Sequence, residues 1–74
     1  MAATQLDLLG LKCPLPALKT RKALKALASG EALHVLANDP LAAIDIPHLI
    51  QETGDRLAET TRDGDVLRFL IVKR

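Results

Sequence analysis

The sequence predicts a small fold of strands and helices in the order βαβαββ, with both helices on one face of the sheet. Segments with strand-like alternation are separated by two segments rich in helix formers, and glycine or proline stands at their boundaries. A helical connection between strands of one sheet favours a right-handed crossover, so two such connections place both helices on the same side.

The length favours one small domain spanning residues 1–74. No internal disulfide can staple it, because the chain has one cysteine. The core must therefore come from Leu, Ile, Val and Ala, which supply most of the 49% hydrophobic content.

The first half of the chain predicts a strand followed by a helix. Residues 5–9 alternate weakly and end at Gly10, which indicates a strand and a short loop. Residues 14–29 are mostly Ala, Leu, Lys and Arg, and Gly30 is placed to stop a helix in the left-handed conformation. A buried helical stripe is expected at Ala17, Thr20, Leu24, Leu27 and Ala28.

The middle of the chain repeats this pattern. Residues 31–37 predict a second strand, after which Asp39 is expected to cap a helix that begins near Pro40. Gly54 would end this helix. Pro47 interrupts it, so we expect a kink or a restart with Asp45 as a local cap. The buried stripe is expected at Ala42, Ala43, Ile46, Leu49, Ile50 and Thr53.

The last third predicts a hairpin. Residues 56–61 and 66–73 read as strands, and Asp63-Gly64 between them is a strong turn signal. Leu67, Phe69 and Ile71 would face the helices. The opposite face, with Leu36, Leu70 and Val72, is either partly buried or a surface for a partner or a second copy.

Composition and charge exclude several classes of partner. The net charge is +1 and Phe69 is the one aromatic residue, so neither bulk electrostatics nor base stacking favours direct nucleic-acid binding. No apolar run approaches the roughly 18 to 20 residues of a membrane-spanning helix. The N-terminus lacks the features of a signal peptide, and with the free thiol this favours the cytoplasm. No metal site or cofactor is expected.

Cys13 is the candidate reactive residue. It precedes Pro14-Leu15-Pro16 at the predicted start of the first helix, so we expect it to be the N-cap, with Pro14 first inside the helix. Unpaired amides and the helix dipole at that position would lower the thiol pKa below the roughly 8.5 of free cysteine. Lys12 could stabilise the same anion, while Pro14 and Pro16 would keep the turn rigid.

These residues resemble the Cys-Pro-x-Pro signature of the small TusA-like (SirA-like) sulfur-carrier family. Residues 8–16 carry the signature, and Asn38-Asp39-Pro40 and Asp45-Ile46-Pro47 match two further family landmarks. The resemblance covers nearly the whole chain. It implies an α+β fold, a two-layer α/β sandwich with a four-stranded mixed sheet.

The resemblance also implies a function. Cys13 would carry persulfide sulfur, accepted from a cysteine desulfurase or a rhodanese and passed to an acceptor protein. The chain would thus be a sulfurtransferase that acts as a carrier, with no turnover of a small substrate by itself. Leu15 stands where the member that feeds tRNA thiolation typically has Glu. Sulfur oxidation, molybdenum-cofactor enzyme maturation and selenium handling therefore remain alternative pathways.

The remaining charged residues have two interpretations. Lys19, Lys22 and Lys25 form either a solvated helix face or, with Leu15, a docking patch for an acidic partner. Asp39 and Asp45 are expected to be helix caps near the site, although a carboxylate beside the sulfur would oppose thiolate formation. His34 and His48 are expected to have ordinary structural roles. We expect a monomer.

The competing function is a non-catalytic protein-binding or redox-regulatory module. It would use the basic helix and the exposed sheet face, with Cys13 as a redox sensor or a structural residue.

Overall fold

The computed structural model describes residues 4–74. Its elements follow the predicted order βαβαββ. They are β1 (Thr4–Asp7), α1 (Leu15–Lys25), β2 (Ala32–Ala37), α2 (Ala42–Thr53), β3 (Arg56–Asp63) and β4 (Val66–Val72).

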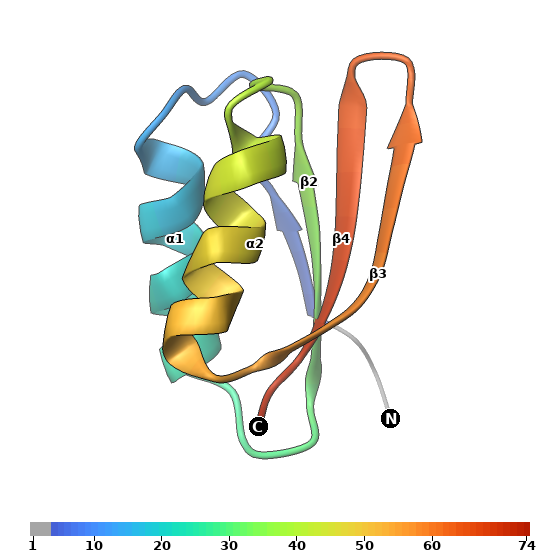
Figure 1. The fold of residues 1–74 in the computed structure, drawn as a ribbon. Coiled ribbons are helices and arrows are strands. Elements are labelled where there is room, and N and C mark those ends of the chain that lie inside the picture. The colour runs from blue at the N-terminus through green and yellow to red at the C-terminus, as the bar shows by residue number, and fades with distance from the viewer. Residues whose placement is uncertain (1–3) are drawn as a thin grey trace.

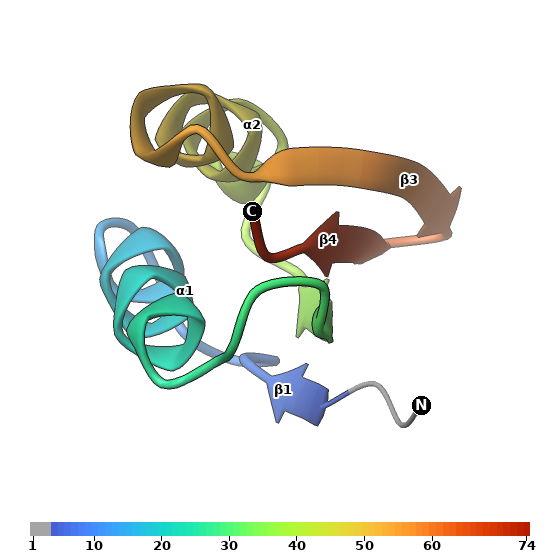
Figure 2. The ribbon, with the colours of Figure 1, turned by 90° about the horizontal axis from the view of Figure 1, so that it is seen from below.

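The four strands form one mixed sheet in the order β1-β2-β4-β3. β1 pairs parallel with β2, whereas β4 pairs antiparallel with both β2 and β3. Both helices cover the same face of this sheet, and the other face is left open (Figures 1 and 2). The α+β fold and its two-layer arrangement are therefore confirmed.

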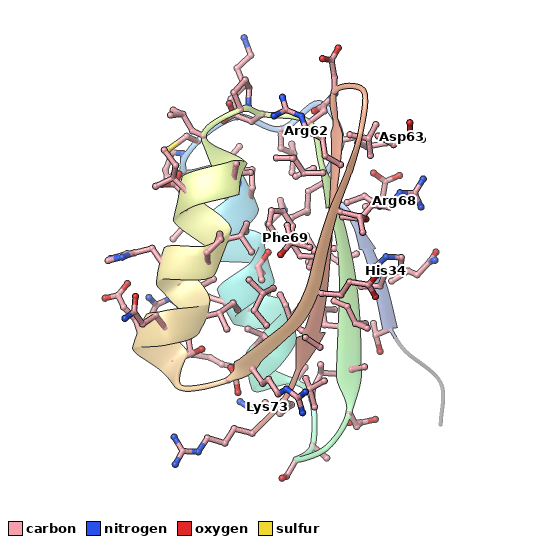
Figure 3. The ribbon with its side chains drawn as sticks, turned by 45° about the vertical axis from the view of Figure 1, so that its right-hand side comes forward. His34, Arg62, Asp63, Arg68, Phe69 and Lys73 are labelled. Atoms are coloured by element: carbon pink, nitrogen blue, oxygen red, sulfur yellow. The ribbon has the colours of Figure 1, made fainter. Side chains whose placement is uncertain are left out.

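The core lies between the helices and the two central strands. Leu33, Val35 and Ala37 of β2 alternate with half-buried residues, and β4 alternates in the same way. Phe69 of β4 is fully buried and points toward the helices (Figure 3). This period of two identifies the inner faces of β2 and β4, as the sequence predicted. The buried apolar residues are Leu8, Leu24, Leu33, Val35, Ala37, Ala42, Ile46, Leu49, Ile50, Leu67, Phe69 and Ile71.

Helix α1 is shorter than the sequence predicted, because it ends at Lys25 rather than near Gly30. The amides of Ala26 and Leu27 bond three residues back, which tightens the last turn. The amide of Ala28 donates a hydrogen bond to Oε1 of Glu31, with 2.6 Å between nitrogen and oxygen. Gly30 does adopt a positive φ of 88°, but in the turn that leads to β2. The predicted stripe is correct at Thr20 and Leu24, partly correct at Ala17 and Leu27, and wrong at Ala28, which is exposed beyond the helix.

Helix α2 runs without a break through Pro47, so the expected restart at Asp45 is wrong. Pro47 has no N–H for the carbonyl of Ala43 four residues earlier. Ala43 is exposed, so water can supply the missing donor. Gly54 ends the helix as predicted, with φ 81° and its amide bonded to the carbonyl of Ile50. Of the expected stripe, Ala43 and Thr53 are exposed and the other four residues are buried.

The β3–β4 hairpin closes with Gly64 and Asp65, since Asp63 pairs with Val66. Gly64 has φ 60°, the left-handed conformation that such a two-residue turn requires. A register shift between Leu57 and Glu59 bends the edge strand β3. Within residues 4–74, neither helix combines the length and apolar character needed to cross a bilayer.

Candidate functional site

Cys13 lies in the loop between β1 and α1, at the end of the molecule where β1 and β2 finish and both helices begin (Figure 1). In layered α/β structures, the carboxyl ends of the strands are where loops converge to form sites. The Cys13 side chain is exposed. Cys13 is therefore not a small buried residue of the core, the structural alternative to a reactive cysteine.

Two side chains from the β2–α2 loop hold the Cys13 loop in place. Oδ2 of Asp39 accepts a 2.6 Å hydrogen bond from the Cys13 amide, and its Oδ1 accepts one from the Leu41 amide at 3.2 Å. Oδ1 of Asn38 accepts a hydrogen bond from the amide of Gly10 at 2.8 Å. The Asn38-Asp39 pair thus fixes the backbone on both sides of the loop. Asp39 was expected to cap a helix that begins near Pro40, but α2 begins at Ala42 and its N-cap is Leu41. Asp39 instead closes the preceding turn through the Leu41 amide and binds the Cys13 backbone, which the sequence did not reveal.

The Cys13 thiol donates a hydrogen bond to Oδ2 of Asp45 on α2, with 3.0 Å between sulfur and oxygen. Asp45 is therefore not a helix cap. Its hydrogen bond raises the pKa of the Cys13 thiol, together with some desolvation and the negative charges of Asp45 and Asp39. The expectation of a lowered pKa is wrong, because the two carboxylates oppose the thiolate.

The start of α1 explains why the helix does not stabilise the thiolate. The N-cap is Pro14, one residue later than predicted, and the helix begins at Leu15. Pro14 and Pro16 have no N–H, and the Leu15 amide donates to the carbonyl of Lys12 at 2.9 Å. Within residues 4–74, no helix amide donates to the sulfur among the hydrogen bonds present. Lys12 is exposed and is not among the groups that shift the thiol pKa.

A groove of about 260 Å³ runs from Cys13 between α1 and α2. Its ionisable residues are Arg21 on α1 and Asp45, His48 and Glu52 on α2. Nε2 of His48 lies 3.5 Å from Oε1 of Glu52 four residues later, and both side chains are exposed. Arg21 and Glu52 were not expected near Cys13 from the sequence. For Glu52, the helical spacing could have served as a signal, because Asp45, His48 and Glu52 share one face of α2. The groove is lined by Cys13, Pro14, Ala17, Leu18, Arg21, Asp45, His48, Leu49 and Glu52.

The lysines proposed as a docking patch lie on another surface. Lys19 and Lys22 border a hollow with Leu6 of β1, on the opposite flank of α1 from the groove. Lys25 is exposed at the end of α1, farthest from Cys13 along the helix. The structure therefore does not bring Lys19, Lys22 and Lys25 together with the sulfur. Pro16 is buried against the core, whereas Pro14 lines the groove.

Exposed apolar side chains lie at the Cys13 end of the molecule instead. The large hydrophobic residues that are most exposed within residues 4–74 all belong to three segments that meet at this end: the β1–α1 loop, the first turn of α1 and the start of α2. Leu15 of the signature is one of them, at 43% exposure. We refer to the set as the apolar collar: Leu9, Leu15, Leu18, Leu41 and Ile44.

The open face of the sheet is less apolar than the sequence suggested. Leu36, Leu70 and Val72 are partly buried there, and His34 and Arg68 project from the same face away from the helices (Figure 3). A shallow hollow on this face is lined by His34, Glu59, Thr61, Arg68 and Leu70. Polar and charged side chains thus interrupt the apolar strip. Within residues 4–74, no group of three or more His, Cys, Asp or Glu side chains is arranged to hold a metal ion.

The fold and the site together define a class of small two-layer α+β proteins that present one exposed cysteine where two helices begin. The family model described as Sulfurtransferase TusA matches residues 4–73. The chain belongs to this family.

Named relatives agree with this assignment. The sulfur carrier protein TusA of Allochromatium vinosum is 44% identical over 69 residues, which cover 93% of this chain and 91% of that protein. A putative sulfur carrier protein of Archaeoglobus fulgidus is 43% identical over 68 residues, covering 90% and 88%. The crystal structure of a SirA-like protein from Desulfitobacterium hafniense superposes with a TM-score of 0.82 at 27% identity, covering 93% of this chain and 95% of that one.

Proposed function

We propose that this chain carries persulfide sulfur on Cys13, accepting it from a cysteine desulfurase or a rhodanese and giving it to an acceptor protein. The observation that carries the proposal is the exposed Cys13 thiol, which lies at the same end of the molecule as the apolar collar. Its relatives named sulfur carriers match nearly the full length of the chain. The whole residue range 1–74 would then serve as one carrier domain acting in the cytoplasm.

Sulfur uptake is a thiol exchange. The Cys13 thiolate attacks the outer sulfur of the donor's persulfide, a new sulfur–sulfur bond forms on Cys13, and the donor cysteine leaves as a thiolate. That thiolate takes the proton that Cys13 lost. Donor persulfide and Cys13 thiol thus become donor thiol and Cys13 persulfide, with no other reactant. Delivery repeats the exchange with the acceptor's thiol as the nucleophile.

The collar supports transfer between proteins rather than turnover of a small substrate. A persulfide of another protein can reach Cys13 only when the two surfaces meet, and apolar side chains such as Ile44 then lose contact with water. Ile44 is 67% exposed, so most of its side chain is available for such burial. The docking surface that this favours is the collar, with Leu15 a member of it, and not the face of Lys19, Lys22 and Lys25.

The proposal is tested by direct labelling. The chain is incubated with a cysteine desulfurase and cysteine, and intact mass is measured before and after treatment with a reductant. We expect one added sulfur atom on the wild type, removed by the reductant, and none on the matched Cys13→Ser variant. A wild type that gains no sulfur, from either a desulfurase or a rhodanese, contradicts the proposal, as does a serine variant that gains as much.

A further inference from the structure

The contact between Cys13 and Asp45 bears on the direction of sulfur transfer. It joins the loop before α1 to the first turn of α2, across 32 residues of sequence. A carboxylate can only accept hydrogen bonds. The 3.0 Å contact therefore requires the proton of the thiol, and a thiolate at the same place would face the carboxylate as a second negative charge.

The other charged groups around the sulfur do not cancel this effect. Asp39 places a second carboxylate on the Cys13 amide. From α1, Arg21 lines the same groove, and from α2, His48 and Glu52 do so. Within residues 4–74, the carboxylate of Glu52 lies beside the His48 ring, and no basic side chain forms a salt bridge with Asp45. Lys12 precedes Cys13 in the loop and is exposed.

We propose that Asp45 is a positioning residue of the carrier: by holding the proton of the empty Cys13 thiol, it shifts the transfer equilibrium toward the empty form and so toward delivery. This inference rests on the proposed function. It adds that the carrier surrenders sulfur more readily than an unpartnered cysteine would.

The reason is that the hydrogen bond exists in only one of the two forms. In the empty form, Sγ carries the proton that Asp45 accepts. In the loaded form, Sγ is bonded to the second sulfur and has no proton to donate, and any remaining proton lies on the outer sulfur about 2 Å farther away. The contact with Asp45 thus stabilises the empty carrier alone. The raised pKa of the Cys13 thiol agrees with this, since the same contact disfavours the thiolate.

The test uses Asp45→Asn, which keeps the size of the side chain and an acceptor oxygen but removes the charge. Glu52→Gln is the matched control, because it removes a carboxylate from the same groove without touching the sulfur. Each protein is equilibrated with a fixed ratio of glutathione persulfide to glutathione, and the loaded fraction is read by intact mass. We expect the loaded-to-empty ratio of Asp45→Asn to exceed that of the wild type by roughly two- to fivefold, the range of an exposed charge interaction. Glu52→Gln should match the wild type.

A second readout follows the proton itself. The rate of Cys13 alkylation by iodoacetamide is measured against pH, and the midpoint for Asp45→Asn should lie below that of the wild type. An unchanged or higher midpoint, or an unchanged or lower loaded ratio, overturns the inference. If Asp45→Asn does not fold, the pH midpoint of Cys13 alkylation is measured for the wild type both in its native state and unfolded in urea. A native midpoint at or below the unfolded midpoint also overturns the inference.

These measurements need no protein donor, so the two proposals can fail separately. If a desulfurase loads the wild type while Asp45→Asn changes neither readout, only the role of Asp45 is wrong. If no donor loads the wild type while both readouts shift, the Asp45 contact stands and the carrier function is wrong.

Discussion

Replacing Thr20 by valine should stabilise the protein, because the Thr20 hydroxyl is buried without a partner. Thr20 lies at the centre of the buried face of α1 and is 0% exposed. Within residues 4–74, its Oγ1 finds no hydrogen-bond partner. Burying an unpaired hydroxyl costs about 1–3 kcal/mol in proteins. Valine has nearly the same shape and a similar helix propensity, so most of this cost should disappear.

The lower end of this range already gives a measurable change. In a chain of this size, about 1 kcal/mol moves the midpoint of thermal unfolding by about 4–8 °C. We expect Thr20→Val to raise the midpoint by at least this amount, followed by far-UV circular dichroism. Cys13 alkylation should stay at the wild-type rate, because Thr20 does not line the Cys13 groove.

The control is Thr20→Ser, which keeps the hydroxyl and deletes the methyl group. It should destabilise the protein by about 1 kcal/mol, as the loss of one buried methyl group does. If Thr20→Val unfolds at a lower temperature than the wild type, the Thr20 hydroxyl does not destabilise the fold as proposed. That result would mean that the hydroxyl forms a hydrogen bond which valine cannot replace.

Two further predictions concern the site. Because the folded pKa of Cys13 is raised, its thiol stabilises the fold below the unfolded pKa of about 8.5, and this contribution is lost as pH rises through the folded value. Between neutral pH and about pH 10, the urea concentration at the unfolding midpoint should therefore fall more for the wild type than for Cys13→Ser. The serine keeps a hydrogen-bond donor for Asp45 but does not titrate in this range. Equal falls in the two proteins would contradict the prediction. Ile44→Ser should weaken sulfur uptake from a desulfurase by roughly tenfold in kcat/KM, the cost of losing about 1.4 kcal/mol of burial, while leaving iodoacetamide alkylation unchanged. Ala58→Ser, exposed on β3, is its control, and a similar loss in both variants would exclude a specific role for the collar.

The strand and turn predictions succeeded because their signals are local. The alternation of Leu67, Phe69 and Ile71 reports which face of β4 is buried, whatever the rest of the chain does. Gly54 and Gly64 mark positions that need a positive φ, and both adopt it. The end of α1 was mispredicted because Gly30 was not needed there: a tightened last turn and the side chain of Glu31 satisfy the amides first.

Asp45 shows how a local pattern can have a second meaning. Before Pro47, an aspartate is the expected cap of a new helix. However, α2 has already begun at Ala42, so Asp45 lies inside the helix with its carboxylate free to bind elsewhere. It binds Cys13 because α1 and α2 pack side by side on the same face of the sheet (Figure 2). The sequence predicted a thiolate stabilised by a helix end, whereas the structure has a thiol that donates a hydrogen bond to a carboxylate.

The sequence alone determined the order of elements, the buried faces of β2 and β4, the family and the exposed cysteine between a strand and a helix. These follow from periodicity, from turn residues and from the proline-framed motif, each of which is read within a few neighbouring residues. Only the tertiary structure decided the chemical state of that cysteine and the surface around it. Asp39 and Asp45, which are separated along the chain, both bind Cys13, and the residues of the apolar collar lie at the same end of the molecule. They come together there because the packing of both helices on one sheet brings the first turns of the helices to the same end.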